Sequence, residues 1–510
     1  MTGNKFNGIT YFLKGKRSFC ALLLAMIFLF TTSIAAYAEQ VIAPTANPIA
    51  GIYGAPQNIE LKTQTVAASV YYTTDGSEPT TADTLYIDLI KVATNMTIRA
   101  IAVKDGMENS SVSTFEYVLF AGGDGSVDNP YQVATAEQLN NVRNHLDKHF
   151  IQTADIDLGV EPYNTGAGWE PIGNDLSPFT GTFDGNGKII SKLTIKSTRN
   201  YVGLFGFANG SHIKNVKLED VNVTGNYQVG GLVGDNKNGE ITNSYATGSV
   251  TGTDYVGGLV GYNYWGTITR SYATATVTGT NYVGGLVAYN DCGEITNSYA
   301  TSAVAGDFSV GGLVGMNFDY SDDTETITDS YASGDVTGTV GVGGLVGENN
   351  NGAITNSYAT GAVTGIGDDV VDVVDVGGLV GYNEGVITNS YATGAVTGTG
   401  GDVVGVGGLV GINDQGTITA SFWDTETSGM KSSAGGDDAV GETTEKMKKK
   451  TTFENKNWDF IDIWDIDGIR NNGYPFLIKN PPVGPDNLLT ITAATGGSIT
   501  TGSSSNYPAG

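Results

Sequence analysis

A six-residue phrase, Val-Gly-Gly-Leu-Val-Gly, recurs along the chain and constrains its fold more than any other feature. A near-constant period of 20 to 50 residues is typical of proteins built by stacking one structural unit on the next. The leucines of the eight copies are separated by 28, 27, 27, 27, 32, 34 and 30 residues, and they stand at Leu204, Leu232, Leu259, Leu286, Leu313, Leu345, Leu379 and Leu409.

Each repeat contains three short runs compatible with β-strands, separated by Asn-Gly, Thr-Gly or Asp-Gly corners, which is the pattern of one β-solenoid coil. Two other repeat architectures fit less well. A propeller blade needs about 40 residues or more, which exceeds the observed period, and a leucine-rich repeat needs several leucines per unit where this chain has one. With 73 glycines and 15% charged residues, the composition also favours a turn-rich β protein. We therefore predict an all-β chain with a right-handed parallel β-helix at its centre.

A single coil cannot fold alone, because fixing 27 backbone residues costs about 1 to 2 kcal/mol each. Burying an apolar side chain returns only about 1.5 to 3 kcal/mol. Ile241 and Tyr245 are an even number of residues apart, so in a strand they point to the same side, and we predict that this side is the interior. Leu232 and Val233 are neighbours and point to opposite sides, and the sequence leaves open which of them is buried. The candidate interior side chains of the coil 229–255 are Val229, Leu232, Val233, Ile241, Tyr245 and Val250.

The repeated phrase resembles the GLUG motif of secreted and surface bacterial proteins, among them adhesin-like chains and certain IgA-cleaving metallopeptidases. Full copies stand at 229–234, 256–261, 310–315, 342–347, 376–381 and 406–411; 283–288 ends in alanine and 202–206 is shorter. The stretch SFWDTETSG at 421–429 resembles the usual closing segment of such arrays. The resemblance implies an extracellular, noncatalytic repeat array, and it defines no ligand.

Residues 41–118 alternate apolar and polar side chains between Asp-Gly turns, which predicts a small antiparallel β-sandwich. The stretch YYTTDGSEP at 71–79 resembles the Ig-like module at the C-terminus of chitobiases and hexosaminidases. In that family the module is accessory and has no catalytic residues.

Residues 122–150 predict one amphipathic helix between the sandwich and the repeats. Thr135 is a candidate N-cap with Glu137 in the first turn, and Leu139, Val142 and Leu146 recur at helical spacing. We expect this helix to cover the open end of the stack, where strand edges would otherwise remain unpaired.

The two ends of the chain carry different signals. Four basic residues, an apolar run over 19–30 and a small-residue ending at Ala38 predict a secretory signal peptide, with a retained membrane anchor as the alternative. At the other end, PPVGPD at 481–486 predicts a stiff linker, and residues 489–510 resemble the opening of an internalin-type bacterial repeat.

We therefore divide the chain as follows: signal peptide 1–38, Ig-like sandwich 39–120, capping helix and first coils 121–200, GLUG solenoid 201–430, closing segment 431–480, and linker with truncated repeat 481–510.

The formal net charge is −27, and removing the basic leader makes it more negative. Such a surface repels nucleic acid and anionic membranes, and we expect neither as a partner. Outside the leader, Cys292 is the one cysteine, so an intramolecular disulfide is excluded and the thiol is interpreted as a small buried hydrophobe.

Catalytic patterns are weak. His145-Leu146-Asp147-Lys148-His149 has the spacing of the zinc motif H-E-x-x-H, but leucine replaces the glutamate that acts as base, and a solvated capping helix is the simpler interpretation. His212 stands alone. Between 229 and 418 the basic residues are Lys237 and Arg270, too few for a lyase acting on acidic sugars. We predict that the chain is not an enzyme and needs no cofactor.

Two groups of residues are candidates for ligand contact. The aromatic group, near one polar turn, is suited to stacking on sugars, with simple packing as the alternative; it comprises Tyr262, Tyr264, Trp265 and Tyr289. The acidic group lies in two inserted loops that are suited to calcium, with plain solvation as the alternative; it comprises Asp368, Asp369, Asp372 and Asp375, and Asp319, Asp322 and Asp323.

Together these features predict a secreted or cell-surface repeat protein that binds extracellular glycans or surface proteins without catalysis. The alternative is an accessory region of a secreted polysaccharide-degrading enzyme or peptidase whose catalytic domain is not in this sequence.

Overall fold

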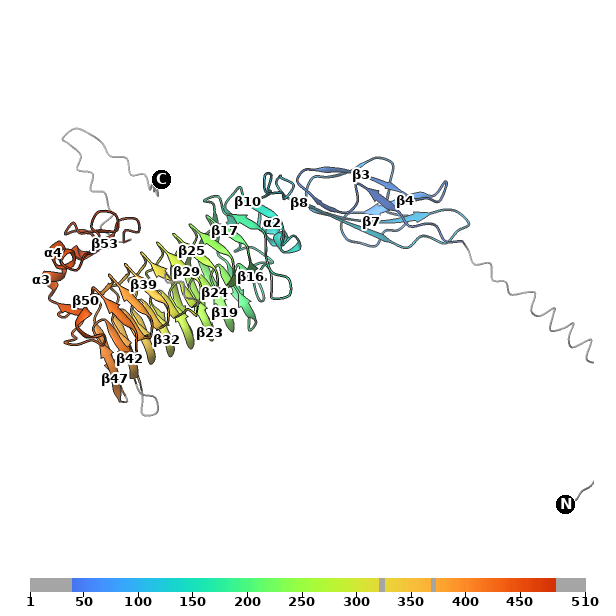
Figure 1. The fold of residues 1–510 in the computed structure, drawn as a ribbon. Coiled ribbons are helices and arrows are strands. Elements are labelled where there is room, and N and C mark those ends of the chain that lie inside the picture. Colours follow the sequence, from blue (N-terminus) through green and yellow to red (C-terminus); the bar gives the residue numbers. More distant parts are fainter. Residues whose placement is uncertain (1–38, 321–325, 368–372, 401, 483–510) are drawn as a thin grey trace, which may run out of the picture. The chain divides into compact units, whose positions relative to one another are not determined.

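The computed structural model describes residues 39–320, 326–367, 373–400 and 402–482 (Figure 1). They form two compact units, of which the first ends at Leu119 and the second begins at Phe120. The expected signal peptide, most of the expected linker and the expected C-terminal repeat lie outside the described residues. In the described part, no helix combines the length and the apolar character needed to cross a membrane.

The first unit is a small β-sandwich, as the alternation predicts. Every pair of neighbouring strands is antiparallel except β2 and β8, which are parallel. Its core contains the fully buried side chains of Ile59, Val92, Ile98 and Ala100. One sheet consists of β1 (Thr45–Asn47), β3 (Gln57–Lys62) and β6 (Ile90–Val92), and the other of β2 (Gly51–Tyr53), β8 (Ser113–Leu119), β7 (Met96–Val103), β4 (Ser69–Thr73) and β5 (Thr84–Leu85).

The second unit is a parallel β-solenoid of about eight coils, which confirms the predicted fold class (Figure 1). Each coil contributes a strand to each of four parallel sheets, numbered 1 to 4 in the order in which the chain passes through them. Sheet 1 comprises β15 (Asn200–Val202), β19 (Tyr227–Gly230), β23 (Asp254–Gly257), β27 (Asn281–Gly284), β32 (Phe308–Gly311), β37 (Val340–Gly343), β42 (Val373–Gly377) and β47 (Val403–Gly407). Sheet 2 comprises β16 (Phe205–Asn209), β20 (Val233–Lys237), β24 (Val260–Tyr264), β28 (Val287–Asp291), β33 (Val314–Phe318), β38 (Val346–Asn350), β43 (Val380–Asn383) and β48 (Val410–Asn413).

Sheets 3 and 4 extend further toward the ends of the solenoid. Sheet 3 comprises β9 (Tyr131–Val133), β10 (His149–Gln152), β12 (Thr182–Asp184), β17 (His212–Lys214), β21 (Glu240–Thr242), β25 (Thr267–Thr269), β29 (Glu294–Thr296), β34 (Ile327–Thr328), β39 (Ala353–Thr355), β44 (Val386–Thr388) and β49 (Thr417–Thr419). Sheet 4 comprises β11 (Ile156–Asp157), β13 (Ile189–Ser191), β14 (Thr194–Lys196), β18 (Lys217–Thr224), β22 (Tyr245–Thr251), β26 (Tyr272–Thr278), β30 (Tyr299–Ala300), β31 (Val304–Ala305), β35 (Tyr331–Ala332), β36 (Val336–Gly338), β40 (Tyr358–Ala359), β41 (Val363–Ile366), β45 (Tyr391–Ala392), β46 (Val396–Thr399), β50 (Ser421–Asp424) and β51 (Ala439–Glu442).

The repeated phrase supplies two of these strands, which is one more strand per coil than the sequence predicts. A bend at Gly231-Leu232 separates β19 from β20. Because this bend interrupts the alternation of side chains, both Leu232 and Val233 are fully buried. A Cβ on Gly230 would lie 2.2 Å from the carbonyl oxygen of Val233, so only glycine fits where the two strands meet.

Two ladders of buried polar side chains line the interior, and both were missed in the sequence. In the first, the Nδ2 atom of Asn263 donates to Oδ1 of Asn290 at 2.8 Å and to the carbonyl oxygen of Gly266 at 2.9 Å. In the second, the backbone N–H of Ser244 donates to Oγ of Ser271 at 3.2 Å. The asparagine ladder comprises Asn236, Asn263, Asn290, Asn317, Asn349, Asn383 and Asn413.

One tyrosine of each coil pairs in register with that of the next and forms a column on sheet 4, which comprises Tyr245, Tyr272, Tyr299, Tyr331, Tyr358 and Tyr391. This tyrosine column faces outward, so the prediction that Tyr245 points into the interior is wrong, whereas Ile241 is fully buried as predicted. Asn243 adopts a left-handed φ of 48° at the corner between sheets 3 and 4, and this corner resets the alternation. Ala246 therefore takes the interior position. The tyrosines stack on the outer face of sheet 4, with the ring centres of Tyr272 and Tyr299 4.6 Å apart and the ring planes almost parallel.

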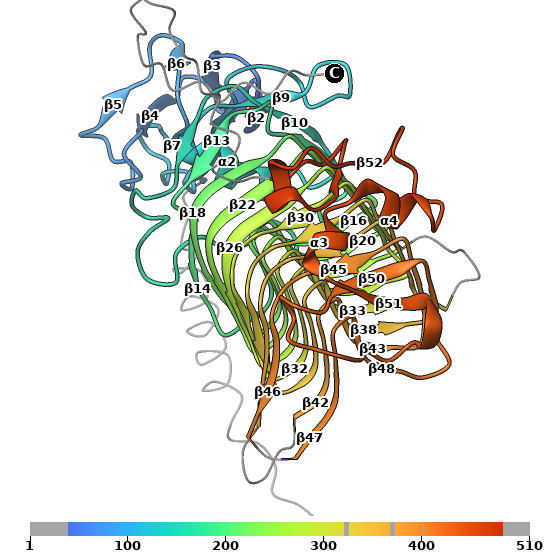
Figure 2. The same cartoon turned by 90° about the vertical axis from the view of Figure 1, so that its left-hand side faces the viewer.

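The C-terminal segment folds back over the far half of this tyrosine column (Figure 2). Trp458 and Trp464 pack against the ring of Tyr391, and Tyr331, Tyr358 and Tyr391 are fully buried in consequence. The segment comprises η2 (Gly436–Asp438), α3 (Thr444–Met447), α4 (Lys450–Glu454), β52 (Trp464–Asp465), η3 (Arg470–Gly473) and β53 (Phe476–Leu477).

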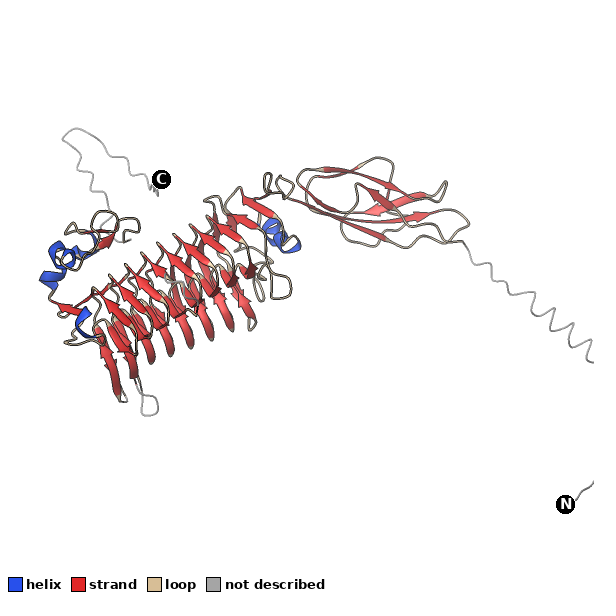
Figure 3. Cartoon of the chain, in the orientation of Figure 1, coloured by secondary structure: helices blue, strands red, loops and turns tan. Residues whose placement is uncertain are grey.

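Among the described residues of the second unit, helices occur at the two ends of the solenoid (Figure 3). At the N-terminal end, α2 (Ala136–Asn141) is capped by Thr135, whose side chain accepts from the N–H of Gln138. This helix is shorter than predicted, because it gives way to η1 (Val142–Asn144) and then to strand β10. His145 and His149 therefore do not share a helical face, which removes the geometric basis of the zinc-like spacing.

Candidate ligand-contact surface

Tyr262 and Tyr289 lie side by side on sheet 2, where β24 and β28 pair in register. Their rings are 5.3 Å apart, and the ring of Tyr255 from sheet 1 lies 5.8 Å from that of Tyr262. Both are half-buried, and the hydroxyl of Tyr262 donates to Asp291 Oδ2 at 2.5 Å. Burial raises the pKa of Tyr289 to about 12. These two predicted residues form the packed base of the surface.

Tyr264 and Trp265 lie further along the chain, at the corner where sheet 2 ends and sheet 3 begins. Trp265 is 42% exposed and Tyr320 is 60% exposed. Their rings are 6.0 Å apart at an interplanar angle of 78°, and Trp265 Nε1 donates to the Tyr320 hydroxyl at 3.4 Å. Lys237 Nζ lies 5.4 Å from the ring centre of Tyr264. We call Tyr264, Trp265, Phe318 and Tyr320 the aromatic patch.

Tyr320 was missed in the sequence, although the signal was present. It is the one tyrosine within the acidic insertion 318–326, and the prediction for that loop concerned its carboxylates. The structure instead brings an aromatic side chain from this loop to Trp265, 55 residues earlier in the chain.

The backbone of Trp265 is unusual for a bulky residue. Its φ is +53°, in the left-handed region that L-residues with large side chains disfavour by about 1 to 2 kcal/mol. Gly210, Asn238 and Cys292 occupy the same step in neighbouring coils, also with positive φ. Tyr201, Tyr255 and Tyr282 also have a positive φ, but they are half-buried, so Trp265 differs from them in its exposure of 42%.

Of the acidic candidates, Asp375 is described and Asp368, Asp369 and Asp372 lie outside the described residues, as do Asp322 and Asp323. Burial, followed by the nearby Glu348 carboxylate, raises the pKa of Asp375 to about 6. Asp319 is buried at the base of its loop. No group of three or more potential metal ligands occurs among the residues that the structure describes, and the calcium prediction stays a prediction.

The histidines and the cysteine are placed separately. His145 packs edge-on against Phe120 and Tyr131, and burial lowers its pKa. His149 begins strand β10, and His212 lies in β17 with its Nδ1 2.9 Å from Glu240 Oε2. Cys292 has a free, half-buried thiol whose pKa is raised by burial, so it is a poor nucleophile.

The fold and this surface define a class of protein: a β-solenoid array with a separate β-sandwich unit. Comparison with family models makes the class specific. Residues 225–251, 252–278, 279–305, 306–337, 338–364 and 374–397 match the GLUG motif, and residues 48–114 match the chitobiase/beta-hexosaminidase C-terminal domain. These two predicted resemblances are confirmed, whereas the resemblance of residues 489–510 to an internalin-type repeat stays a prediction. The chain thus contains six matched GLUG repeats and, earlier in the sequence, one domain of the chitobiase/beta-hexosaminidase C-terminal type.

Two curated relatives resemble parts of the chain. A protein of Evansella cellulosilytica named "Putative Gly-rich membrane protein" is 39% identical over 137 residues, which are 25% of this chain and 15% of the relative. Halomucin of Haloquadratum walsbyi is 38% identical over 164 residues, 30% of this chain and 2% of the relative. The chain therefore spans only a small part of the length of these relatives.

Two solved structures are also similar. A "putative immunoglobulin A1 protease" from Bacteroides ovatus aligns with a TM-score of 0.40 at 22% identity, covering 71% of this chain and 95% of that one. A second structure, entitled "IgA1 Protease", aligns with a TM-score of 0.35 at 15% identity, covering 72% of this chain and 27% of that one.

Proposed function

We propose that this chain is a noncatalytic extracellular or cell-surface protein whose solenoid binds glycans through the aromatic patch. The exposed rings of Trp265 and Tyr320 meet nearly at right angles, so they offer two walls to one ligand. Sugars have apolar C–H faces and polar hydroxyl edges, and tryptophan and tyrosine combine an apolar ring with a hydrogen-bonding group in the same way. Lys237 beside Tyr264 adds a further donor.

One observation carries this proposal: the left-handed tryptophan. If the ring of Trp265 served packing alone, it would be buried, yet 42% of the residue is exposed at a step where neighbouring coils place the smaller residues Gly210, Asn238 and Cys292. At this left-handed step a tryptophan is expected to make the coil less stable than glycine or asparagine would. We therefore explain Trp265 by ligand binding and not by folding. The extracellular location is supported by the predicted leader sequence and by the membrane-protein name of one relative.

The test compares two substitutions at the same step of different coils. Trp265→Asn removes the indole ring from the patch and relieves the left-handed strain, whereas Gln415→Asn changes the same step in a coil outside the patch. On a glycan array, we expect Trp265→Asn to lose about tenfold or more in binding, as for a central aromatic contact. Its melting temperature should equal or exceed that of the parent. Gln415→Asn should bind like the parent.

Unchanged glycan binding by Trp265→Asn would overturn the proposal. The alternative, an accessory region of a secreted hydrolase or peptidase, is addressed by incubating the bound glycans, and protein substrates, with the chain and measuring released products. If products are still released after further purification of the chain, the activity belongs to the chain and it is an enzyme. Binding without product favours the proposed function.

A further inference from the structure

A concave surface lies on the outer face of sheet 3, at the N-terminal end of the solenoid. Four consecutive strands, β10, β12, β17 and β21, form its floor, and the loop before β9 forms one wall with Val127 and Pro130. The groove encloses about 430 Å³, which is within the usual size of small-molecule sites. The backbone N–H of His149 donates to the carbonyl oxygen of Gly125 at 3.2 Å, which ties the wall to the floor.

The floor carries two parallel rows of side chains, because residues i and i+2 of a strand share a face. One row reads His149, Thr182, His212 and Glu240 along the solenoid, and the other reads Ile151, Asp184, Lys214 and Thr242. Strands of a sheet are about 4.8 Å apart, so the four rungs extend over about 14 Å along the axis. A ligand that fills the groove is elongated and runs along the stack.

Four ionisable groups of the groove form two acid–base pairs. His212 Nδ1 lies 2.9 Å from Glu240 Oε2, and Lys214 Nζ lies 3.4 Å from Asp184 Oδ2. Such pairing leaves little net charge for an anionic or cationic ligand. It leaves hydrogen-bond donors and acceptors at close intervals, next to the apolar surfaces of Val127, Pro130 and Ile151.

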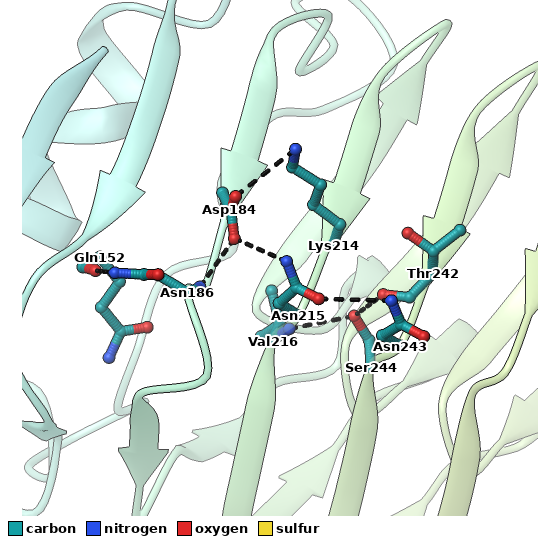
Figure 4. A network of polar contacts seen from close by, with 9 residues as sticks. All are labelled: Gln152, Asp184, Asn186, Lys214, Asn215, Val216, Thr242, Asn243 and Ser244. Atoms are coloured by element: carbon teal, nitrogen blue, oxygen red, sulfur yellow. Dashed lines mark hydrogen bonds and ion pairs between the residues drawn. The ribbon is translucent and has the colours of Figure 1, made fainter. Parts of the chain in front are cut away.

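The Asp184 carboxylate is held rigidly (Figure 4). Its Oδ1 accepts from the backbone N–H of Asn186 at 2.7 Å and from Nδ2 of Asn215 at 2.9 Å. Asn215 in turn accepts from Asn243 of the next coil at 3.4 Å. A network that extends over successive coils thus fixes one acceptor at the groove floor before any ligand arrives, and such preorganisation lowers the entropic cost of binding.

We infer that this groove is a binding site for a neutral oligosaccharide of two or three sugar units lying parallel to the solenoid axis. A polyhydroxyl chain matches both the alternating donors and acceptors of the floor and the apolar wall. The groove shares none of its lining residues with the aromatic patch, and the inference does not rest on the proposed function, so either site can fail without the other.

The experiment uses the imidazole signals of the full chain, labelled selectively with ¹⁵N-histidine. The chain has three histidines, and two of them, His149 and His212, line the groove, whereas His145 packs among aromatic rings and serves as an internal control. The probes are neutral pentasaccharides of glucose, mannose and N-acetylglucosamine, with a galacturonic acid pentasaccharide as the acidic arm. At least one neutral probe should shift the signals of His149 and His212 and leave His145 unchanged.

Two substitutions locate the site. Glu240→Gln removes a half-exposed carboxylate from the groove, and Glu294→Gln removes one from the same row, two rungs further along and outside the groove. We expect Glu240→Gln to weaken binding about tenfold, as for a hydrogen bond to a charged group, and Glu294→Gln to leave it unchanged. Trp265→Asn should also leave these shifts unchanged.

The inference is overturned if no neutral probe moves the two histidine signals, if only the acidic probe does, or if Glu240→Gln and Glu294→Gln weaken binding equally. Shifts abolished by Trp265→Asn would likewise assign the binding to the aromatic patch and not to the groove.

Discussion

Two glycines of one repeated phrase, Gly343 and Gly347, should respond very differently to alanine. Neither has a left-handed φ, so the space around the new Cβ decides the outcome. At Gly343 the Cβ would lie 1.8 Å from the carbonyl oxygen of Val346, and at Gly347 it would lie 2.5 Å from that of Gly315. Both neighbours are backbone atoms, so no side chain can rotate to make room.

The magnitudes follow from what has to move. A methyl group 1.8 Å from a carbonyl oxygen forces the bend open by more than 1 Å, about the displacement that separates a good hydrogen bond from a broken one. The adjacent ladder bond from Leu345 N–H to Leu379 O, 2.8 Å long, would then be lost or weakened. Overpacking and an unmade buried bond together cost about 3 kcal/mol or more.

Gly347 should tolerate alanine better, because the chain already contains that change. Ala288 occupies the equivalent step of another coil and is fully buried there. The smaller overlap is partly offset by the lower entropy of an unfolded alanine, so we expect a loss below about 1.5 kcal/mol.

Urea unfolding of both variants, followed by far-UV circular dichroism, measures the difference through the midpoint at constant slope. The reasoning would be refuted if both variants lost the same free energy of unfolding, or if Gly347→Ala lost more. Gly343 would then not be the glycine that the sharp bend requires, and Gly347 would not be the tolerant position.

The buried asparagine ladder should be equally sensitive. Asn290→Ala removes the bond from the Asn263 amide to Asn290 and the bonds that Asn290 donates to the Asn317 carbonyl oxygen and to the backbone carbonyl of Gly293, while Asn263 keeps its bond to Gly266. Three lost buried bonds at about 1 kcal/mol or more each predict a loss of about 3 kcal/mol or more in the same urea titration. Asn413→Ala, at the end of the ladder, should cost less. Burial raises the pKa of Asp235 to about 7, so its folded form binds more protons than the unfolded form between about pH 4 and pH 7, and stability should fall as pH rises through that window. Asp235→Asn should flatten the dependence of the melting temperature on pH there, and an unchanged profile would contradict the assigned burial.

The coil architecture could be predicted from the sequence because it depends on repetition, which one sequence shows directly. The period, the parallel stacking and the interior position of Ile241 all follow from copies of the same pattern. The direction of Tyr245 could not be predicted, because alternation is reliable only within an unbroken strand and Asn243 places a left-handed residue before it. The burial of both Leu232 and Val233 has the same origin in the bend at Gly231-Leu232.

The candidate site was predictable only in part for a related reason. Tyr262, Tyr264, Trp265 and Tyr289 do gather on one side, since they occupy equivalent or adjacent steps of neighbouring coils. Their different exposure depends on whether the step lies within a strand or at a corner. Tyr320 joins them from an insertion, and insertions have no copy elsewhere in the chain from which their position could be inferred.

In a solenoid of this kind, the residues that repeat are those that the coil needs, and the residues that depart from the repeat are free to serve a ligand. The left-handed corner step shows the distinction: asparagine and glycine satisfy the backbone there, and Trp265 satisfies it poorly. The groove shows it again, because the row that holds threonine at Thr242, Thr269 and Thr296 changes to Asp184 and Lys214 at the N-terminal end. Both proposed sites therefore lie where the consensus fails while the fold continues, and this is where substitutions should separate binding from stability.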